Sequence, residues 1–287
     1  MTPVAETRLL RQSAAAWGLV TPMLLLIVFC FIVPLGAMGV ISFSPSEGGT
    51  LLPGFTLDAY NSFLGDPFYQ GMIFRSIQLS VTVTALALLV TYPIALFLHR
   101  LESRWKSLLV VITVAPLLVS AVVRTYGWMV IMGDNGWINA VLRFFGLPTV
   151  RLFNTYNGVL IGMTEILMPY MALGLIAGFN RIDPLLEEAA ASLGASPWRR
   201  FVRVTLPLSV SGIGLGCLLC FVLAMSAFVT PSLLGGGRVF VLATEIYDQA
   251  VNSLDWPLAA AMSMFALILF TAVLVLYNRL SRRWESL

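Results

Sequence analysis

Long apolar runs dominate this chain, and short segments between them hold most of its charged residues. Four of the runs, residues 12–46, 76–98, 204–237 and 256–278, contain no Asp, Glu, Lys or Arg. Each is long enough to supply the roughly 20 residues with which a helix crosses the hydrocarbon core of a membrane. Because the runs are continuous rather than alternating, they predict helices and not the strands of a membrane barrel.

Two further apolar runs are each interrupted by one charged residue. Residues 107–131 continue past Arg124, and residues 152–179 contain Glu165. Prolines inside the runs do not exclude helices, since neighbouring helices can satisfy the carbonyls that a proline leaves free. The predicted fold class is therefore all-α, a polytopic membrane protein. Its six transmembrane helices are predicted at residues 16–41, 76–98, 107–131, 157–179, 209–232 and 257–278.

Composition supports a membrane protein and excludes a soluble enzyme. Hydrophobic residues make up 59% of the 287 residues and charged residues only 11%, whereas soluble domains average about 45–50% and about 25%. No low-complexity segment or soluble domain interrupts the pattern. The predicted organisation is one six-helix membrane domain, residues 16–278, between an N-terminal tail at 1–15 and a C-terminal tail at 279–287.

The distribution of basic residues predicts the orientation. If the N-terminus is cytoplasmic, the cytoplasmic segments are 1–15, 99–106, 180–208 and 279–287, and they hold 12 of the 17 Lys and Arg residues. Because cytoplasmic loops of membrane proteins are enriched in Lys and Arg, we expect both termini to be cytoplasmic. The net charge of +3 then reflects topology and gives no reason to expect a nucleic-acid partner.

The segment between the fourth and fifth predicted spans has the features of two short helices. Asp183 is a suitable N-cap and Pro184 suits the first helical position. Gly194 can end this helix in a left-handed conformation, and Ser196 with Pro197 can start a second helix. We expect a helix–turn–helix at the cytoplasmic surface. Its second helix places an apolar stripe, Trp198, Phe201 and Val202, beside three arginines.

The same segment resembles the EAA loop of ATP-binding-cassette (ABC) importer permeases. That family's pattern is EAA, three residues, Gly, nine residues and Ile-x-Leu-Pro. This chain has Glu188-Ala189-Ala190, then Gly194, then 204–207 with Val in place of Ile. The resemblance implies a type I ABC importer permease fold and a coupling loop at 180–208 that docks on an ATPase subunit. The coupling residues it implies are Glu188, Ala189, Ala190, Gly194, Phe201 and Pro207. An amphipathic helix lying on lipid headgroups is the alternative.

Other stretches resemble the first-permease type of spermidine/putrescine-type importers. They are 124–128 with 136–139, 228–236 and 255–261. The resemblance implies a multi-pass protein of the cell inner membrane that carries a polyamine or another amine or amino-acid-like solute. It also implies as partners a second permease, two copies of an ABC ATPase subunit, a periplasmic or extracellular solute-binding protein and membrane lipid.

No catalytic or metal-binding residue is predicted in this chain. It lacks the GxxxxGK[ST] loop that cradles nucleotide phosphates. We therefore expect no cofactor here, and we expect ATP and Mg²⁺ on the partner ATPase subunits. The chain is then not an enzyme by itself.

Glu165 is the most unusual residue of the predicted spans, because a carboxylate inside a membrane is costly and indicates a pathway or an interior partner. Pro169, four positions later, leaves the Glu165 carbonyl without its helical N–H partner. Glu165, with Arg124, Tyr126 and Trp128, is a candidate lining of the solute pathway. The alternatives are a structural ion pair of Glu165 with Arg124 or Arg75, and snorkelling of Arg124 beside an aromatic belt.

A rival function is a stand-alone secondary transporter or channel in which Glu165 is the cation or proton site. The coupling loop distinguishes the two functions, because only an ATP-driven importer needs it. Two small-residue pairs, Gly174 with Gly178 and Gly212 with Gly216, are GxxxG motifs that predict a close helix crossing.

Overall fold

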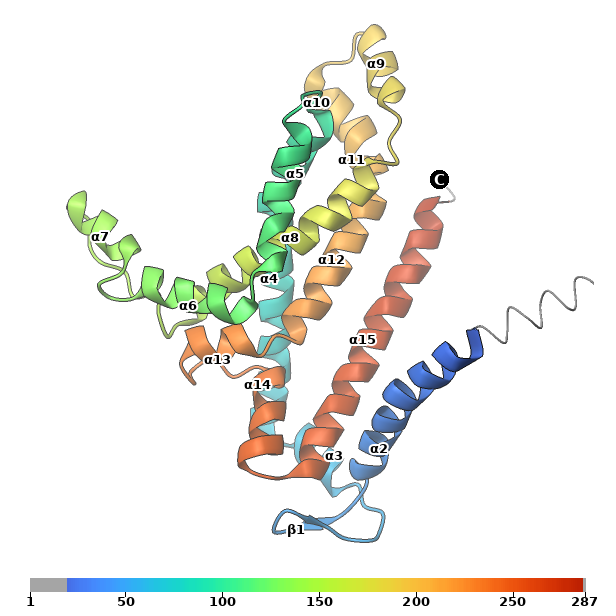
Figure 1. The fold of residues 1–287 in the computed structure, drawn as a ribbon, viewed down its shortest axis with the longest axis vertical. Coiled ribbons are helices and arrows are strands. Elements are labelled where there is room, and N and C mark those ends of the chain that lie inside the picture. The colour runs from blue at the N-terminus through green and yellow to red at the C-terminus, as the bar shows by residue number, and fades with distance from the viewer. Residues whose placement is uncertain (1–19, 286–287) are drawn as a thin grey trace, which may run out of the picture.

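The computed structural model describes residues 20–285 and is built mainly of helices (Figure 1). The first span is helical over Val20–Ile41. The elements that follow from Val28 onward are η1 (Val28–Ile32), α2 (Val33–Ile41), β1 (Ser46–Glu47), β2 (Thr50–Leu51), α3 (Asp58–Gly65), α4 (Pro67–Arg100), α5 (Lys106–Val114), η2 (Ala115–Leu118), α6 (Ala121–Met132), α7 (Trp137–Phe144), α8 (Tyr156–Phe179), α9 (Pro184–Ser192), α10 (Pro197–Arg200), η3 (Phe201–Thr205), α11 (Leu206–Leu208), α12 (Val210–Met225), α13 (Val229–Gly235), α14 (Leu242–Tyr247), η4 (Asp248–Asn252) and α15 (Trp256–Glu285).

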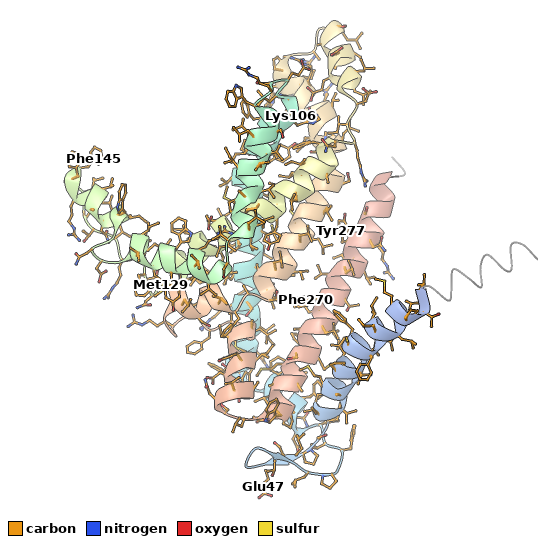
Figure 2. All side chains as sticks on the ribbon, in the orientation of Figure 1. Glu47, Lys106, Met129, Phe145, Phe270 and Tyr277 are labelled. Carbon is orange, nitrogen blue, oxygen red and sulfur yellow. The ribbon has the colours of Figure 1, made fainter. Side chains whose placement is uncertain are left out.

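The long helices α4, α12 and α15 lie along the length of an elongated molecule (Figure 1). One end carries α9 and α10 with the start of α5, where Figure 2 labels Lys106. The opposite end carries α3 and the antiparallel hairpin of β1 and β2, where Figure 2 labels Glu47. The segments 99–106 and 180–208 thus lie at the same end, as the predicted orientation requires.

The core lies where α8 packs against α4 and α12. Small residues allow the close approach of α8 and α12. A Cβ added at Gly174 would lie 2.5 Å from the Gly216 Cα atom, and one added at Gly178 would collide with Gly212. The predicted GxxxG crossing is confirmed, and it joins these two motifs to each other.

The first span packs differently, because its 18 most apolar residues include none that is buried. It contacts α15 through α2, and the exposed side chains are large and apolar, such as Phe29 and Phe31. Water would penalise such a surface strongly, whereas lipid tails do not. The exposure therefore fits a helix that faces lipid.

The predicted span at 107–131 is not one continuous helix. The helix of α5 passes into η2 at Ala115, Val119 is extended, and α6 restarts after Ser120 at 94° to the earlier axis. Pro116 has no N–H for the Ile112 carbonyl, which weakens the helix at this point. The apolar run is the same whether the helix is straight or bent, so the pattern did not reveal the turn.

The predicted span at 209–232 is also wrong at its outer end. α12 ends at Met225, and α13 is a separate helix that begins at Val229. An uninterrupted helix would need an N–H at Pro231 for the Ala227 carbonyl, and proline has none. At its inner end, α12 continues from 197–208 through a bend of 60°.

The other predicted spans are confirmed with changed ends. The second is α4, which starts at Pro67 because Asp66 caps it by accepting a hydrogen bond from the Phe68 N–H at 2.8 Å. The fourth is α8 and the sixth is α15, which continues as a helix to Glu285. Within residues 20–285, four helices are long and apolar enough to cross a membrane, and there are up to six if each bent pair counts as one span. The tail at 1–15 and residues 16–19 of the first span lie outside the described residues.

Candidate functional site

The segment 180–208 folds as two helices with the caps that its sequence predicts. The Asp183 carboxylate accepts a hydrogen bond from the Leu185 N–H at 2.9 Å, and α9 follows. Gly194 has φ +77°, the left-handed conformation that suits glycine. The Ser196 hydroxyl then accepts from the Arg199 N–H and caps α10. The predicted helix–turn–helix is confirmed, and we call residues 180–208 the coupling loop.

The coupling loop presents apolar side chains outward at the end of the molecule. Leu193 is 89% exposed and Trp198 is 72% exposed, and Leu185 and Leu186 are exposed beside them. Ala189 is exposed on the same helix. Figure 1 shows α9 beyond the ends of the long helices, where no other helix covers it. An apolar surface on a projecting loop is typical of a docking site for another protein.

The predicted coupling residues divide into exposed and packed positions. Glu188 and Ala189 are exposed and Ala190 is half-buried. Phe201 instead packs inward, with its ring centroid 6.0 Å from that of Tyr92 on α4. Pro207 lies in α11, next to the 60° bend into α12. Phe201 and Pro207 therefore join the loop to the bundle.

Glu187 fastens α9 to the end of α4 and to η3. Its Oε1 atom accepts a hydrogen bond from Arg100 Nη2 at the end of α4, at 3.0 Å. The same oxygen accepts a hydrogen bond from the hydroxyl of Thr205 in η3. Thr205 is fully buried. We call Arg100, Glu187 and Thr205 the loop clamp.

The loop clamp lowers the pKa of the Glu187 carboxyl. Burial by itself raises that pKa, but the hydrogen bonds from Thr205 and Arg100 and the charge of Arg100 outweigh it. The sequence analysis missed this residue, because the EAA pattern begins one position later, at Glu188. The available signal was a second glutamate, next to Glu188, in a loop on the same side of the membrane as the basic residues at the end of the second predicted span.

The structure brings together three of the four residues proposed for the solute pathway. Arg124 Nη2 lies 2.6 Å from Glu165 Oε1, and Trp128 Nε1 donates to Glu165 Oε2 at 3.0 Å. Arg124 Nη2 also donates to the Glu165 carbonyl at 3.0 Å, which is the carbonyl that Pro169 leaves free. Tyr126 does not join this cluster and is 53% exposed.

The Arg124–Glu165 pair is a structural contact that remains partly open to its surroundings. The Arg124 side chain is 10% exposed and that of Glu165 is 35% exposed. Arg124 Nη1 donates to the Pro116 carbonyl at 3.3 Å, so the same side chain contacts η2 and α8. The ion pair anticipated between these two residues is therefore present, and whether Glu165 also lines a pathway stays a prediction.

Comparison with known proteins identifies the class. Residues 91–286 match the family model of the binding-protein-dependent transport system inner membrane component. The spermidine/putrescine transport system permease protein PotB of Escherichia coli (strain K12) is 32% identical, over 90% of this chain and 94% of its own length. The molybdenum transport system permease protein ModB of Haemophilus influenzae is 30% identical, over 75% of this chain and 96% of its own.

Solved structures show the same fold. A bacterial alginate ABC transporter, in complex with an alginate pentasaccharide-bound periplasmic protein, matches 96% of this chain and 96% of its own with a TM-score of 0.78 and 16% sequence identity. The fold, the matched family and the 32% identity to a permease agree with one another. The chain therefore belongs to the family of binding-protein-dependent transport system inner membrane components, as the permease subunit of an ABC importer.

Proposed function

We propose that this permease forms, with a second and different permease, the membrane path of an importer for a polyamine or a similar small organic amine. A solute-binding protein would deliver the amine from outside. Two copies of a separate ATPase subunit would drive the cycle through the coupling loop. In this family the membrane component is not the catalytic subunit, and ATP hydrolysis belongs to a separate chain.

The outward apolar face of the coupling loop carries the proposal for an ATPase partner. Leu193 and Trp198 are exposed there, and the loop clamp ties their helices to α4 and η3. Closing of the ATPase subunits on ATP would pull on this face, and the loop clamp would pass the displacement to the spans. The bundle would then change from an inward-facing to an outward-facing arrangement. The ATPase on one side of the membrane and the binding protein on the other would both shift the equilibrium between these two arrangements.

Similarity to PotB supports an amine as the solute. PotB matches at the highest identity of the three proteins compared above and over 90% of this chain. The names of the other two mention molybdenum and alginate, so membership in the family leaves the solute open. The solute is therefore the part of the proposal that most needs a direct measurement.

The rival function, a stand-alone transporter with Glu165 as a proton or cation site, finds less support. The Glu165 carboxylate accepts hydrogen bonds from both Arg124 and Trp128. The charge of this carboxylate is already compensated by a guanidinium at 2.6 Å, so a second cation gains less from binding there.

The test is uptake by the complete importer in liposomes, with the second permease, the ATPase and the binding protein. We expect labelled spermidine or putrescine to enter only with ATP inside and the loaded binding protein outside. The variant Ala189→Trp, on the exposed face of α9, should stop uptake. Ala191→Trp is the matched control, because Ala191 is also exposed but lies about 200° around the helix from Ala189.

Two results would contradict the proposal. Uptake driven by a proton gradient without ATP would support the stand-alone transporter. ATP-dependent uptake of another solute class, with no uptake of either amine, would retain the coupling mechanism and refute the amine.

A further inference from the structure

A cavity of about 360 Å³ lies among α13, α14 and η4, away from the coupling loop. Its volume falls in the range of small-molecule sites, about 300–1,000 Å³. Two carboxylates, Glu245 and Asp248, line it together with the rings of Phe228, Phe240 and Tyr247. Figure 1 shows α14 toward the end that carries α3 and the hairpin, opposite α9. We call this space the acidic cavity.

Glu245 is buried at the acidic cavity, and no basic side chain of the described residues pairs with it. It is only 8% exposed. The one hydrogen bond that these residues give its carboxylate comes from Gln249 Nε2, at 2.8 Å. A buried carboxylate needs a compensating positive charge or several hydrogen bonds to offset its lost hydration. The site therefore favours a cationic occupant.

Asp248 adds a second negative charge one helical turn after the first. Its carboxylate accepts a hydrogen bond from Asn252 at 2.7 Å and is otherwise exposed. Arg238, in the segment before α14, lines a different cavity of about 240 Å³ together with Arg75. These two arginines line the other cavity and not the acidic cavity, so they do not neutralise its two carboxylates.

The aromatic wall favours an organic cation over a hydrated metal ion. The rings of Phe228 and Tyr247 are tilted by 33° to each other with centroids 4.4 Å apart, and the face of either ring can attract a bound ammonium group. A metal ion would instead seek a shell of oxygen ligands. The three aromatic rings among the lining supply no such ligand.

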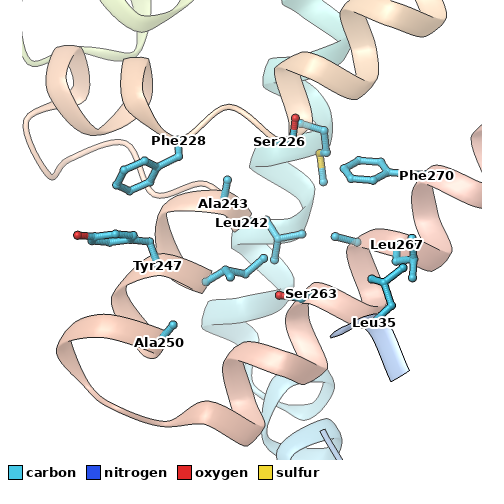
Figure 3. A pocket seen from close by; sticks show the side chains of 13 residues that line it. Leu35, Ser226, Phe228, Leu242, Ala243, Tyr247, Ala250, Ser263, Leu267 and Phe270 are labelled. Atoms are coloured by element: carbon cyan, nitrogen blue, oxygen red, sulfur yellow. The ribbon is translucent and has the colours of Figure 1, made fainter. Parts of the chain in front are cut away.

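The same two aromatic rings border a second, apolar cavity of about 540 Å³ (Figure 3). Figure 3 shows Phe228 and Tyr247 on one side of this space and Leu267 and Phe270 on the other. A ligand that reaches across the ring pair would meet carboxylates at one end and aliphatic or aromatic groups at the other. This arrangement complements an ammonium group carried on a chain of methylene carbons.

We infer that the acidic cavity is the site at which this permease receives an alkyl ammonium solute, with Glu245 as its ion-pair partner and Tyr247 and Phe228 as its aromatic wall. The inference rests on the proposed function, because it assumes that the importer carries an amine. It adds a specific acceptor site within this chain, separate from Glu165.

The experiment measures uptake and ATP hydrolysis together in liposomes that contain the complete importer. The probes are ¹⁴C-labelled spermidine and putrescine, presented by saturating binding protein. The variant Glu245→Gln removes the charge and keeps an oxygen for Gln249. We expect it to carry about tenfold less amine per ATP hydrolysed, while ATPase stimulation by the loaded binding protein is retained. Tyr247→Leu should lower the same ratio, and Tyr247→Phe should keep it near the wild-type value.

The matched control is Glu47→Gln, which removes one carboxylate at the same end of the molecule but on the exposed hairpin. It should leave the ratio of amine to ATP unchanged. A wild-type ratio in Glu245→Gln would overturn the site while the proposed function stands. Equal losses of uptake and ATPase activity would make Glu245 a folding residue and also overturn the site. Failure of the wild-type importer to carry either amine would refute both.

Discussion

Removal of the Glu187 carboxylate should loosen the coupling loop while the rest of the bundle stays folded. Glu187 connects α9 to α4 through Arg100 and to η3 through the buried hydroxyl of Thr205. In Glu187→Ala both connections disappear, and the Thr205 hydroxyl keeps only a 3.4 Å contact with Arg100. We therefore expect α9 to separate from the bundle more often.

The size of the effect follows from the surroundings of the two contacts. The Arg100 side chain is 45% exposed, and exposed ion pairs contribute at most about 1 kcal/mol. Thr205 is fully buried, and a buried hydroxyl that loses its partner costs about 1–3 kcal/mol. Since Thr205 keeps its contact with Arg100, we expect a total of about 2 kcal/mol. The separated population of α9 should then rise about 30-fold.

Amide hydrogen exchange of the importer in nanodiscs measures this population directly. Exchange of the α9 amides should accelerate about 30-fold in Glu187→Ala, and exchange of the α12 amides should not change. Glu188→Ala is the matched control, because Glu188 is on the same helix and exposed. Equal acceleration in both variants would refute the loop clamp, and so would a uniform acceleration that includes α12.

Three further predictions concern the loop and the helix crossing. Gly194→Val should impair ATP-linked uptake more than Gly194→Asn, because asparagine tolerates the left-handed backbone at φ +77°; uptake assays compare the two. Gly174→Ala should lower the thermal stability by about 1–3 kcal/mol through its collision with Gly216. Gly71→Ala, with open space around the added methyl group, should raise it slightly; differential scanning fluorimetry measures both. The folded-state pKa of the Glu187 carboxyl is lowered, so its stabilisation of α9 should be complete above about pH 4.3 and should fade as the pH falls further. The hydrogen-exchange rates of the α9 amides in wild type and in Glu187→Gln should therefore become equal at low pH.

Local signals made the coupling loop predictable. The caps at Asp183 and Ser196 and the left-handed Gly194 act within a few residues of chain, and each has the same effect in a peptide and in a protein. The apolar runs likewise predict which segments are lipid-facing or core helices. These features depend on residues close in sequence, so sequence reasoning can reach them.

The directions of the helices, and contacts between residues far apart in the sequence, were not predictable in the same way. The turn at Val119 and Ser120 leaves the apolar pattern of 107–131 unchanged, because a membrane or a protein core accepts the same residues on either side of a bend. Glu187 finds Arg100 across 87 positions of the chain, and Glu245 becomes significant only when α13 and α14 enclose a cavity around it. Each requires the tertiary packing to be known.

The two ion pairs of the described residues have a common role that their places in the fold make clear. Arg124 joins α8 to the break at Pro116, because it donates to the Pro116 carbonyl and to both the carboxylate and the carbonyl of Glu165. Arg100 and Glu187 join α4 and α9 beside the 60° bend that leads into α12. Hydrogen bonds along a continuous helix fix its direction, and a break removes some of them. A charged pair between separate segments restores that constraint at the point of the break. In a chain with so few charges, such pairs set the direction of helices that apolar packing alone leaves free to swing.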